Sequence, residues 1–320
     1  MTSSRLPGMN DPISECGCDP ADAGKQAARA LPRASRPRIA THCVCCGGAD
    51  IQSSPAILMP FVAHRAFGWY PVEIDESWGL HTIRQGMAYS ICKSLHCTAC
   101  GFLFLDIRFS DEELANLYHD YRGPAYNALR EQYEPGYTSR NDALNAGSSY
   151  IEQCEAFLAP FLEFPLSLLD WGGDTGRNTP FKGQCDVFDI YDISAKPVIE
   201  GATVVGKAEA FARKYGLIVC SNVLEHVPYP ADVLDDITRT MDARSVLYVE
   251  VPLEPLMQEA WAAPHQKKRH WHEHVNFYSE ESLRKLLAQC GLTTLALERL
   301  RVEEGDSAFS VFQVACRLAE

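Results

Sequence analysis

The chain has 320 residues, which is long enough for two domains. Its formal net charge is −13, from 29 Lys and Arg against 42 Asp and Glu, and this acidic balance argues against nucleic acid as the main partner. The most apolar stretch, residues 156–171, contains Glu163 and two prolines, so we expect no membrane span.

Residues 1–40 are rich in Ala, Ser, Pro, Arg and Asp and have no apolar periodicity, so we expect a disordered tail. The tail begins MTSSRLPGMNDPISE, which lacks the apolar core of a secretory signal, and we therefore expect a cytoplasmic protein. Disulfides are rare in that compartment. The 13 cysteines, including Cys16 and Cys18 in the tail, then need another explanation.

A cysteine-containing lobe with short β-like runs follows at residues 41–106. Cys43 and Cys46 make one C-x2-C pair, and Cys97 and Cys100 make a second one. Two such pairs can direct four thiolates to one metal, so the spacing predicts a structural Zn²⁺ site with no open position. Reduced, buried thiols are the alternative interpretation. If one ligand is assigned wrongly, the substitutes are Cys45, Cys92, His42 and His96.

Residues 107–141 are expected to form a helical connector. Ser110 and Glu113 have the capping-box spacing at the start of a helix over 110–121. The next stretch, YRGPAYNALREQYEPGY, mixes aromatic residues and arginines. This mixture suits contacts with a sugar or a phosphate, and it equally suits a packed connector.

Residues 142–320 form the last predicted domain. A long amphipathic helix is expected over 142–162, and strand and helix patterns then alternate. Such alternation predicts an α/β fold, with a mostly parallel sheet and helices on both faces. The last two strands, over 293–300 and 308–318, are joined by a polar turn and predict an antiparallel edge.

The first strand of this domain ends in the glycine-rich turn DWGGDTG, with Gly172, Gly173 and Gly176. Ligands bind at the carboxyl ends of parallel strands, so the turn is well placed for a binding site. Two phosphate-binding patterns fail, because Arg177 follows Gly176 where a P-loop has lysine and Asp174 breaks the G-x-G-x-x-G spacing. A cofactor without phosphates or a plain tight turn remains.

This turn and the motifs after it resemble those of class I S-adenosylmethionine-dependent methyltransferases. The matching segments come in the expected order: LLDWGGDTG (168–176), YDIS (191–194), GKAEAF (206–211), YGLIVCSNVLEHV (215–227), VLYVEVP (246–252) and HEHVNFYSEESLRKLLAQCGL (272–292). The resemblance covers residues 142–318. It implies a Rossmann-like seven-stranded sheet with an antiparallel last strand, and S-adenosylmethionine as the methyl donor. Two residues depart from the family pattern. Asp174 stands where many members have a second glycine, and Gly216 stands where an Asp often precedes the fourth strand.

The resemblance also implies which residues hold the cofactor. The three glycines of the turn let the backbone approach the amino acid end of the cofactor, and Asp170 is expected to help bind its ammonium group. Asp192 is expected to accept hydrogen bonds from the ribose hydroxyls, with Asp189 as the alternative. Further cofactor-binding residues are expected to be Gly172, Gly173, Gly176, Ala208, Glu209 and Asn222.

Three histidines are candidates for the catalytic role: His226, His272 and His274. Methyl transfer to a hydroxyl or an acidic carbon needs a base, and histidine titrates near neutral pH. The alternation of His270, His272 and His274 beside Glu273 also fits a metal-binding face. Structural histidines are the third interpretation.

The zinc-binding lobe resembles the one that precedes the transferase domain in some sugar methyltransferases. We therefore expect methyl transfer to a small-molecule acceptor, with a nucleotide-linked sugar or glycan precursor as first choice. Lys267, Lys268 and Arg269 either meet an anionic group of such an acceptor or form a solvated loop. Two alternatives are an O- or N-methyltransferase of another metabolite, and a non-catalytic cofactor-binding regulator that uses its zinc lobe for protein contact. The oligomeric state is not predicted.

Overall fold

The computed structural model describes residues 36–70, 73, 75–79, 92–139, 150–194, 196–259, 262–304 and 307–320. Most of the predicted tail, with Cys16 and Cys18, lies outside these ranges. Residues Pro37–Glu320 form one compact unit. Within the described ranges, no helix has both the length and the apolar character needed to cross a membrane.

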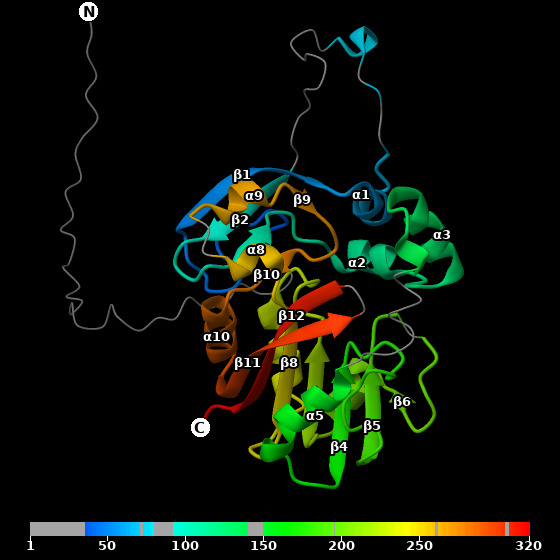
Figure 1. The fold of residues 1–320 in the computed structure, drawn as a ribbon, viewed down its shortest axis with the longest axis vertical. Coiled ribbons are helices and arrows are strands. Elements are labelled where there is room, and N and C mark those ends of the chain that lie inside the picture. Colours follow the sequence, from blue (N-terminus) through cyan, green and yellow to red (C-terminus); the bar gives the residue numbers. More distant parts are fainter. Residues whose placement is uncertain are drawn as a thin grey trace, which may run out of the picture. The chain divides into compact units, whose positions relative to one another are not determined.

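The larger sheet has seven strands in the order β11-β12-β8-β7-β4-β5-β6 (Figure 1). They are β4 (Leu166–Trp171), β5 (Cys185–Tyr191), β6 (Thr203–Val204), β7 (Leu217–Ser221), β8 (Val246–Pro252), β11 (Leu292–Glu304) and β12 (Ser307–Leu318). Five neighbouring strands, β8, β7, β4, β5 and β6, are parallel to one another. β12 runs antiparallel to both β8 and β11. The predicted α/β fold with its seven-stranded, Rossmann-like sheet and antiparallel closing strand is confirmed.

Helices cover both faces of this sheet, as predicted. Leu168 and Leu169 of β4 are fully buried on opposite faces, since neighbouring strand residues point in opposite directions. The face of Leu168 packs against α5 (Ile151–Leu158). The face of Leu169 packs against α6 (Lys207–Phe211), α7 (Pro230–Thr238) and α10 (Glu280–Gln289).

The helix that precedes β4 is shorter than the predicted range 142–162. It is described from Ile151 to Leu158 and continues as a 3-10 turn, η4 (Ala159–Phe161). Pro160 lies in that turn and has no backbone N–H to continue an α-helix. Residues 142–149 lie outside the described ranges.

A second sheet, of five strands in the order β10-β3-β2-β1-β9, lies in the cysteine-containing lobe. The lobe itself supplies β1 (Ile51–Leu58), β2 (Cys92–Cys97) and β3 (Leu103–Leu105). The two edge strands come from the C-terminal half of the chain: β9 (His270–Trp271) lies parallel to β1, and β10 (Asn276–Phe277) lies antiparallel to β3. Segment 270–277 is therefore part of the N-terminal lobe.

Short helices complete the lobe and the connector. They are α1 (Pro60–Phe67), η3 (Glu76–Trp78), α2 (Asp111–Tyr118), α3 (Pro124–Tyr133), α8 (Pro255–Gln258) and α9 (Pro264–Lys267). The predicted capping box of α2 is present, because the Glu113 N–H donates to Ser110 Oγ at 3.3 Å and the Ser110 N–H donates to Glu113 Oε2 at 2.8 Å. α3 starts with a proline, which suits the first turn of a helix.

Candidate active site

A cavity of about 620 Å³ lies at the carboxyl ends of β4, β7 and β8. Open parallel sheets bind their ligands at this edge. The connector contributes to the lining through Tyr121, Arg122, Arg130 and Tyr137. The predicted site residues that line the cavity are Asp170, Gly172, Gly173, Asn222, His226, His272 and His274. Gly176, Asp192, Ala208 and Glu209 do not line it.

Close packing explains two glycines of the turn. Gly172 has φ +89°, and a Cβ there would lie 2.4 Å from Val223 Cγ2 in the loop after β7. Gly176 has φ +77°, and its Cβ would lie 2.5 Å from Ile190 Cδ1. A larger residue at either position would push the turn away from the strand ends. Asp174, which departs from the family pattern, also has a positive φ, of 50°.

The Asp170 carboxyl group is buried at the end of β4, with 5% of its surface exposed. It accepts a hydrogen bond of 2.5 Å from Thr179 Oγ1. Burial raises the pKa of Asp170 to about 7, although the Thr179 hydroxyl works in the opposite direction. The group is therefore poised between its neutral and charged forms near neutral pH.

Asp192 and Asp189 have different surroundings, although both were candidates for the ribose. Asp192 follows β5, and its two oxygens accept hydrogen bonds from the Asp174 N–H at 2.9 Å and the Ser194 N–H at 2.7 Å. Asp189 is buried and engaged with Arg213 at 2.5 Å and with Tyr215 Oη at 2.7 Å. Asp192 is joined to the glycine-rich turn, which favours it over Asp189 as the ribose ligand.

The remaining predicted cofactor residues lie in the loop after β7 and at the start of α6. Asn222 follows β7 with φ +54° and donates through Nδ2 to Glu250 Oε1 at 3.0 Å. Ala208 and Glu209 lie in the first turn of α6 and are exposed. The Glu209 carboxylate caps its own helix by accepting from the Gly206 N–H at 2.7 Å.

His226 lies in the loop after β7 and is fixed through its Nδ1 atom. That atom is 2.8 Å from Tyr118 Oη and 3.3 Å from the Glu273 carbonyl oxygen. A carbonyl oxygen only accepts hydrogen bonds, so this contact favours a proton on Nδ1 and a free lone pair on Nε2. Burial, with a further contribution from His274, lowers the pKa of His226 to about 3. The ring is therefore neutral near pH 7.

His272 and His274 lie in the segment between β9 and β10, and their ring centroids are 4.5 Å apart. His274 Nδ1 is 2.8 Å from Glu254 Oε1, and its backbone N–H donates to His272 Nδ1 at 3.1 Å. Burial lowers the pKa of His272 to about 4. Burial would also lower the pKa of His274, but the hydrogen bond to Glu254 raises it above the ordinary value.

Glu225 is a cavity residue that the sequence analysis did not assign, although it lies inside the quoted LEHV motif. Only 1% of its surface is exposed, and burial raises its pKa to about 7. Its Oε1 atom lies 3.7 Å from His226 Nε2. The sequence contained a signal for Glu225. It is next to the candidate His226, and both follow a parallel strand, so both are expected at the carboxyl ends of the strands where ligands bind.

Arg130 and Glu273 form a second pair that the sequence did not assign. Arg130 Nη1 is 2.8 Å from Glu273 Oε1, and both side chains are largely buried. Burial works to raise the pKa of Glu273, but Arg130 outweighs it and lowers the pKa to about 2. This ion pair ties α3 to the histidine segment.

The basic stretch before β9 lies outside the cavity lining. Lys268 Nζ lies 4.3 Å from the centroid of the Phe277 ring and 5.1 Å from that of Trp271. Arg269 Nε donates to the Gln266 carbonyl oxygen at 3.3 Å. These contacts stabilise the lobe locally.

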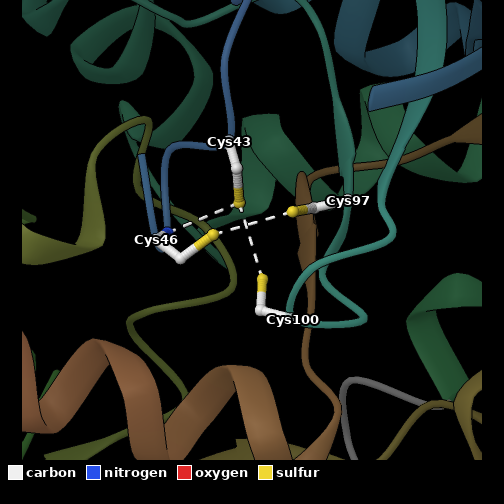
Figure 2. A group of neighbouring side chains, drawn as sticks. All are labelled: Cys43, Cys46, Cys97 and Cys100. Carbon is white, nitrogen blue, oxygen red and sulfur yellow. Dashed lines mark hydrogen bonds between the residues drawn. The ribbon is translucent and has the colours of Figure 1, made fainter. Parts of the chain in front are cut away.

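The four predicted zinc ligands come together in the N-terminal lobe (Figure 2). Sγ of Cys43 is 3.7 Å from that of Cys100, and Sγ of Cys46 is 3.6 Å from that of Cys97. In a tetrahedral zinc site with Zn–S bonds of about 2.3 Å, neighbouring sulfur atoms lie about 3.8 Å apart. The four thiols are therefore already spaced for one zinc ion.

The four substitutes for these ligands have other partners as well, and only Cys45 among them also contacts Cys43 and Cys100 of the cluster. Cys45 Sγ donates to the Ser282 carbonyl oxygen of α10 at 3.1 Å, and Cys92 Sγ donates to the Ala56 carbonyl oxygen at 3.0 Å. His42 Nδ1 is 3.0 Å from Thr41 Oγ1. The His96 ring stacks near His265, with centroids 6.2 Å apart.

Comparison with known proteins gives one family match. Residues 147–297 match the model of a methyltransferase domain family. A search of curated proteins found no match.

Solved structures show weaker likeness. The 1,6-didemethyltoxoflavin N1-methyltransferase of Burkholderia thailandensis, with 1,6-didemethyltoxoflavin and S-adenosylhomocysteine bound, is 18% identical with a TM-score of 0.43 over 61% of this chain and 90% of that chain. The glycopeptide N-methyltransferase MtfA with sinefungin is 8% identical, with a TM-score of 0.40 over 53% and 94% of the two chains. A Leishmania major S-adenosylmethionine-dependent methyltransferase is 14% identical, with a TM-score of 0.41 over 52% and 71%.

The assignment of this chain rests on the family match, and the fold agrees with it. The matched residues include β4 to β8, the glycine-rich turn and all three candidate histidines. The sheet has the seven strands and the antiparallel last strand that the sequence resemblance implies. The chain carries a methyltransferase domain, and the protein is a methyltransferase.

Proposed function

We propose that the protein transfers a methyl group from S-adenosylmethionine to a small-molecule acceptor in the cavity at the carboxyl ends of β4, β7 and β8. The observation that carries this proposal is the composition of the cavity wall. Residues of the glycine-rich turn line one part of it, and His226, His272 and His274 line another. A donor site and an acceptor site are thus expected to adjoin in one cavity.

On the donor side, we assign the amino acid end of the cofactor to Asp170, Gly172 and Gly173. Asp192 is assigned to the ribose, supported by its hydrogen bond to the glycine-rich turn. Gly176 keeps the turn against β5, and Asn222 contributes from the end of β7. Ala208 and Glu209 are assigned to the adenine from the start of α6.

On the acceptor side, His226, His272 and His274 are the proposed catalytic residues. They orient the nucleophilic atom of the acceptor and activate it for in-line attack on the methyl group. Their neighbours support this role, since Tyr118 and Glu254 fix two of the rings by hydrogen bonds of 2.8 Å.

The proposed acceptor is an anionic small molecule, with a nucleotide-linked sugar or glycan precursor as first choice. Arg122 and Arg177 line the cavity together with Tyr121. Guanidinium groups bind phosphates in a bidentate manner, and aromatic rings pack against sugars. O- or N-methylation of another metabolite remains the alternative.

We further propose that Cys43, Cys46, Cys97 and Cys100 bind a structural zinc ion. Four thiolates would leave no position open for catalysis, so the metal would stabilise the lobe. The cysteines in the described ranges are free thiols. This state suits a cytoplasmic location, which we also propose.

The test is a calorimetric titration with S-adenosylhomocysteine, followed by an acceptor screen with labelled S-adenosylmethionine. We expect one binding site per chain. Asp192→Asn should weaken binding about tenfold or more, through loss of charge-assisted hydrogen bonds. Asp186→Asn is the matched control, because Asp186 is exposed near the start of the same strand.

The outcomes separate the candidate functions. If S-adenosylhomocysteine does not bind, or binds equally well to the Asp192→Asn protein, the proposed cofactor site is wrong. If the cofactor binds but no acceptor in a panel of nucleotide sugars, sugar phosphates and amines is labelled, a regulatory role is favoured. Transfer to neutral amines alone would contradict the anionic acceptor.

A further inference from the structure

One carboxylate of the cavity stands apart from the others. Within the described residues, neither carboxylate oxygen of the buried Glu225 accepts a hydrogen bond. The other buried carboxylates that line the cavity are engaged: Asp170 by Thr179, Glu250 by Tyr150, and Glu273 by Arg130. A buried carboxylate without a donor is costly, so Glu225 needs a cationic or hydrogen-bonding occupant of the cavity.

Two histidines face the same place. One ligand atom each of Glu225, His226 and His274 lies within 4.8 Å of the other two. Glu225 and His226 come from the loop after β7, and His274 comes from the segment between β9 and β10. The alternation of His270, His272 and His274 beside Glu273 also fitted a metal-binding face, but His270 is exposed on β9 and does not belong to this group.

Both rings have the arrangement of metal ligands. His226 Nδ1 is held by Tyr118 Oη and His274 Nδ1 by Glu254 Oε1, each at 2.8 Å. These contacts leave Nε2 of each ring as the ligand atom. Histidine ligands of metals are held in the same way, by a hydrogen bond from the second nitrogen to a carboxylate or another polar group.

A second grouping of Glu254, His272 and His274 is weaker. Its atoms are already bonded to one another, since Glu254 holds His274 Nδ1 and His272 Nδ1 accepts from the His274 N–H. The group centred on Glu225 has no such internal hydrogen bonds among its ligand atoms.

We propose that Glu225, His226 and His274 bind a divalent transition-metal cation on the acceptor side of the cavity, and that the acceptor is a hydroxyl compound bound through this cation. Two imidazoles and one carboxylate suit Zn²⁺, Mn²⁺ or Fe²⁺, and three protein ligands leave positions open for an oxygen ligand. This inference rests on the proposed methyltransferase function and gives its histidines a specific role.

The cation would act as a Lewis acid. It would lower the pKa of the acceptor hydroxyl, whose proton leaves to water. The acceptor oxygen then forms a bond to the methyl carbon while the S–CH₃ bond breaks. The electron pair of the broken bond remains on sulfur in S-adenosylhomocysteine. Glu225, His226 and His274 would keep the oxygen in place during this step.

The experiment titrates the full-length protein with Mn²⁺ and follows the free ion by electron paramagnetic resonance. Mn²⁺ prefers nitrogen and oxygen ligands, so the four-cysteine site competes poorly for it. We expect one saturable site per chain. Glu225→Gln and His226→Gln should weaken this site at least tenfold, and Tyr118→Phe should weaken it about tenfold through loss of ring orientation.

Glu152→Gln is the matched control, because Glu152 is an exposed carboxylate on α5 and does not line the cavity. It should bind Mn²⁺ like the unaltered protein. Thermal unfolding and S-adenosylhomocysteine titration of every variant report on folding and on the donor site. A Glu225→Gln protein that binds Mn²⁺ as well as the control, or an unaltered protein without a saturable site, would overturn the proposal.

The same samples distinguish failure of the metal site from failure of the proposed methyltransferase function. Loss of Mn²⁺ binding with intact S-adenosylhomocysteine binding supports the metal site and leaves the donor site in place. Mn²⁺ binding without any cofactor binding would remove the proposed function and keep the metal site. Cofactor binding without Mn²⁺ binding would remove only the metal site.

Discussion

At the residue scale, the proposed contact between Asp170 and the ammonium group of the cofactor should make cofactor binding depend on pH. Its buried carboxyl has a pKa raised to about 7, so the group is mostly neutral below pH 7 and charged above it. The ammonium group of the cofactor favours the charged form. We expect the affinity for S-adenosylhomocysteine to fall about tenfold per pH unit below pH 7 and to level off above it. Calorimetry between pH 5.5 and 8.5 measures this dependence.

Two variants check the cause of this dependence. Asp170→Asn should flatten the profile and weaken binding at high pH. Thr179→Val removes the hydroxyl that lowers the pKa of Asp170, so the midpoint should move upward. A flat profile for the unaltered protein would contradict the role of Asp170.

The sequence predicted some single residues of the site better than others. The glycine-rich turn and the LEHV motif were recognisable because their residues are adjacent in the chain and follow strand ends. The missing hydrogen bonds of Glu225 could not be predicted, because they depend on what α2, β8 and segment 270–277 place around it. The same holds for the pairing of Arg130 with Glu273, which lie 143 positions apart.

At the scale of elements, Cys45 joins the four-cysteine cluster to α10, although it is not one of the four predicted ligands. Cys45 Sγ donates to a carbonyl oxygen of α10, whereas Cys97 Sγ faces Cys46. We expect Cys97→Ser to abolish the binding of about one zinc ion per chain and to lower Tm by roughly 5–10 °C. Elemental analysis and thermal unfolding measure the two effects.

Cys45→Ser makes the same chemical change two residues from Cys43, at a thiol that contacts Cys43 and Cys100 but is not one of the four predicted ligands. It should retain the zinc ion and lower Tm by less than the cluster variant. If the unaltered protein folds without any metal, the structural zinc site is wrong. Equal zinc loss in both variants would mean that Cys45 belongs to the ligand set.

Local patterns predicted most of the elements. Apolar runs gave β4, β5, β7 and β8, and the Ser110–Glu113 spacing gave the start of α2. The two-residue strands β9 and β10 carry no such signal, because their partners lie far away in the chain. The predicted helix over 142–162 was too long, since apolar periodicity outweighed the effect of Pro160.

At the scale of the whole molecule, Arg108 connects the five-stranded sheet to the loop that follows β7 of the larger sheet. Only 1% of its surface is exposed, and it donates to Asn276 Oδ1 at 2.9 Å, to the Pro228 carbonyl oxygen at 3.0 Å and to the Val275 carbonyl oxygen at 3.2 Å. Arg108→Met would remove three hydrogen bonds and their donors from this buried position, including the one to Asn276 Oδ1. We expect it to lower the free energy of unfolding by about 3 kcal/mol or more.

Urea unfolding, followed by both tryptophan fluorescence and circular dichroism, measures this loss. Arg301→Met is the control, because its side chain is 72% exposed and should cost less than about 1 kcal/mol. We expect a single transition in which both signals coincide. Two separate transitions would show that the sheets unfold independently and would contradict the bridging role of Arg108.

The predicted division into a lobe over 41–106, a connector over 107–141 and a domain over 142–320 stays a prediction. It follows the chain in order, as sequence patterns do. The five-stranded sheet takes β9 and β10 from the last of these regions. Sequence patterns could not predict this, because it depends on strand pairing between residues far apart in the chain.

The late arrival of β10 has a consequence for biosynthesis. β3 pairs with β2 on one side, and among the described residues its other side pairs with β10. On the ribosome, Asn276 emerges about 170 residues after Phe104, which takes roughly 10–35 s at ordinary elongation rates. For that time the nascent lobe presents an uncovered strand edge, a surface on which neighbouring chains can add. We therefore expect ribosome-bound chains that end before residue 276 to be bound by chaperones more than the full-length chain is.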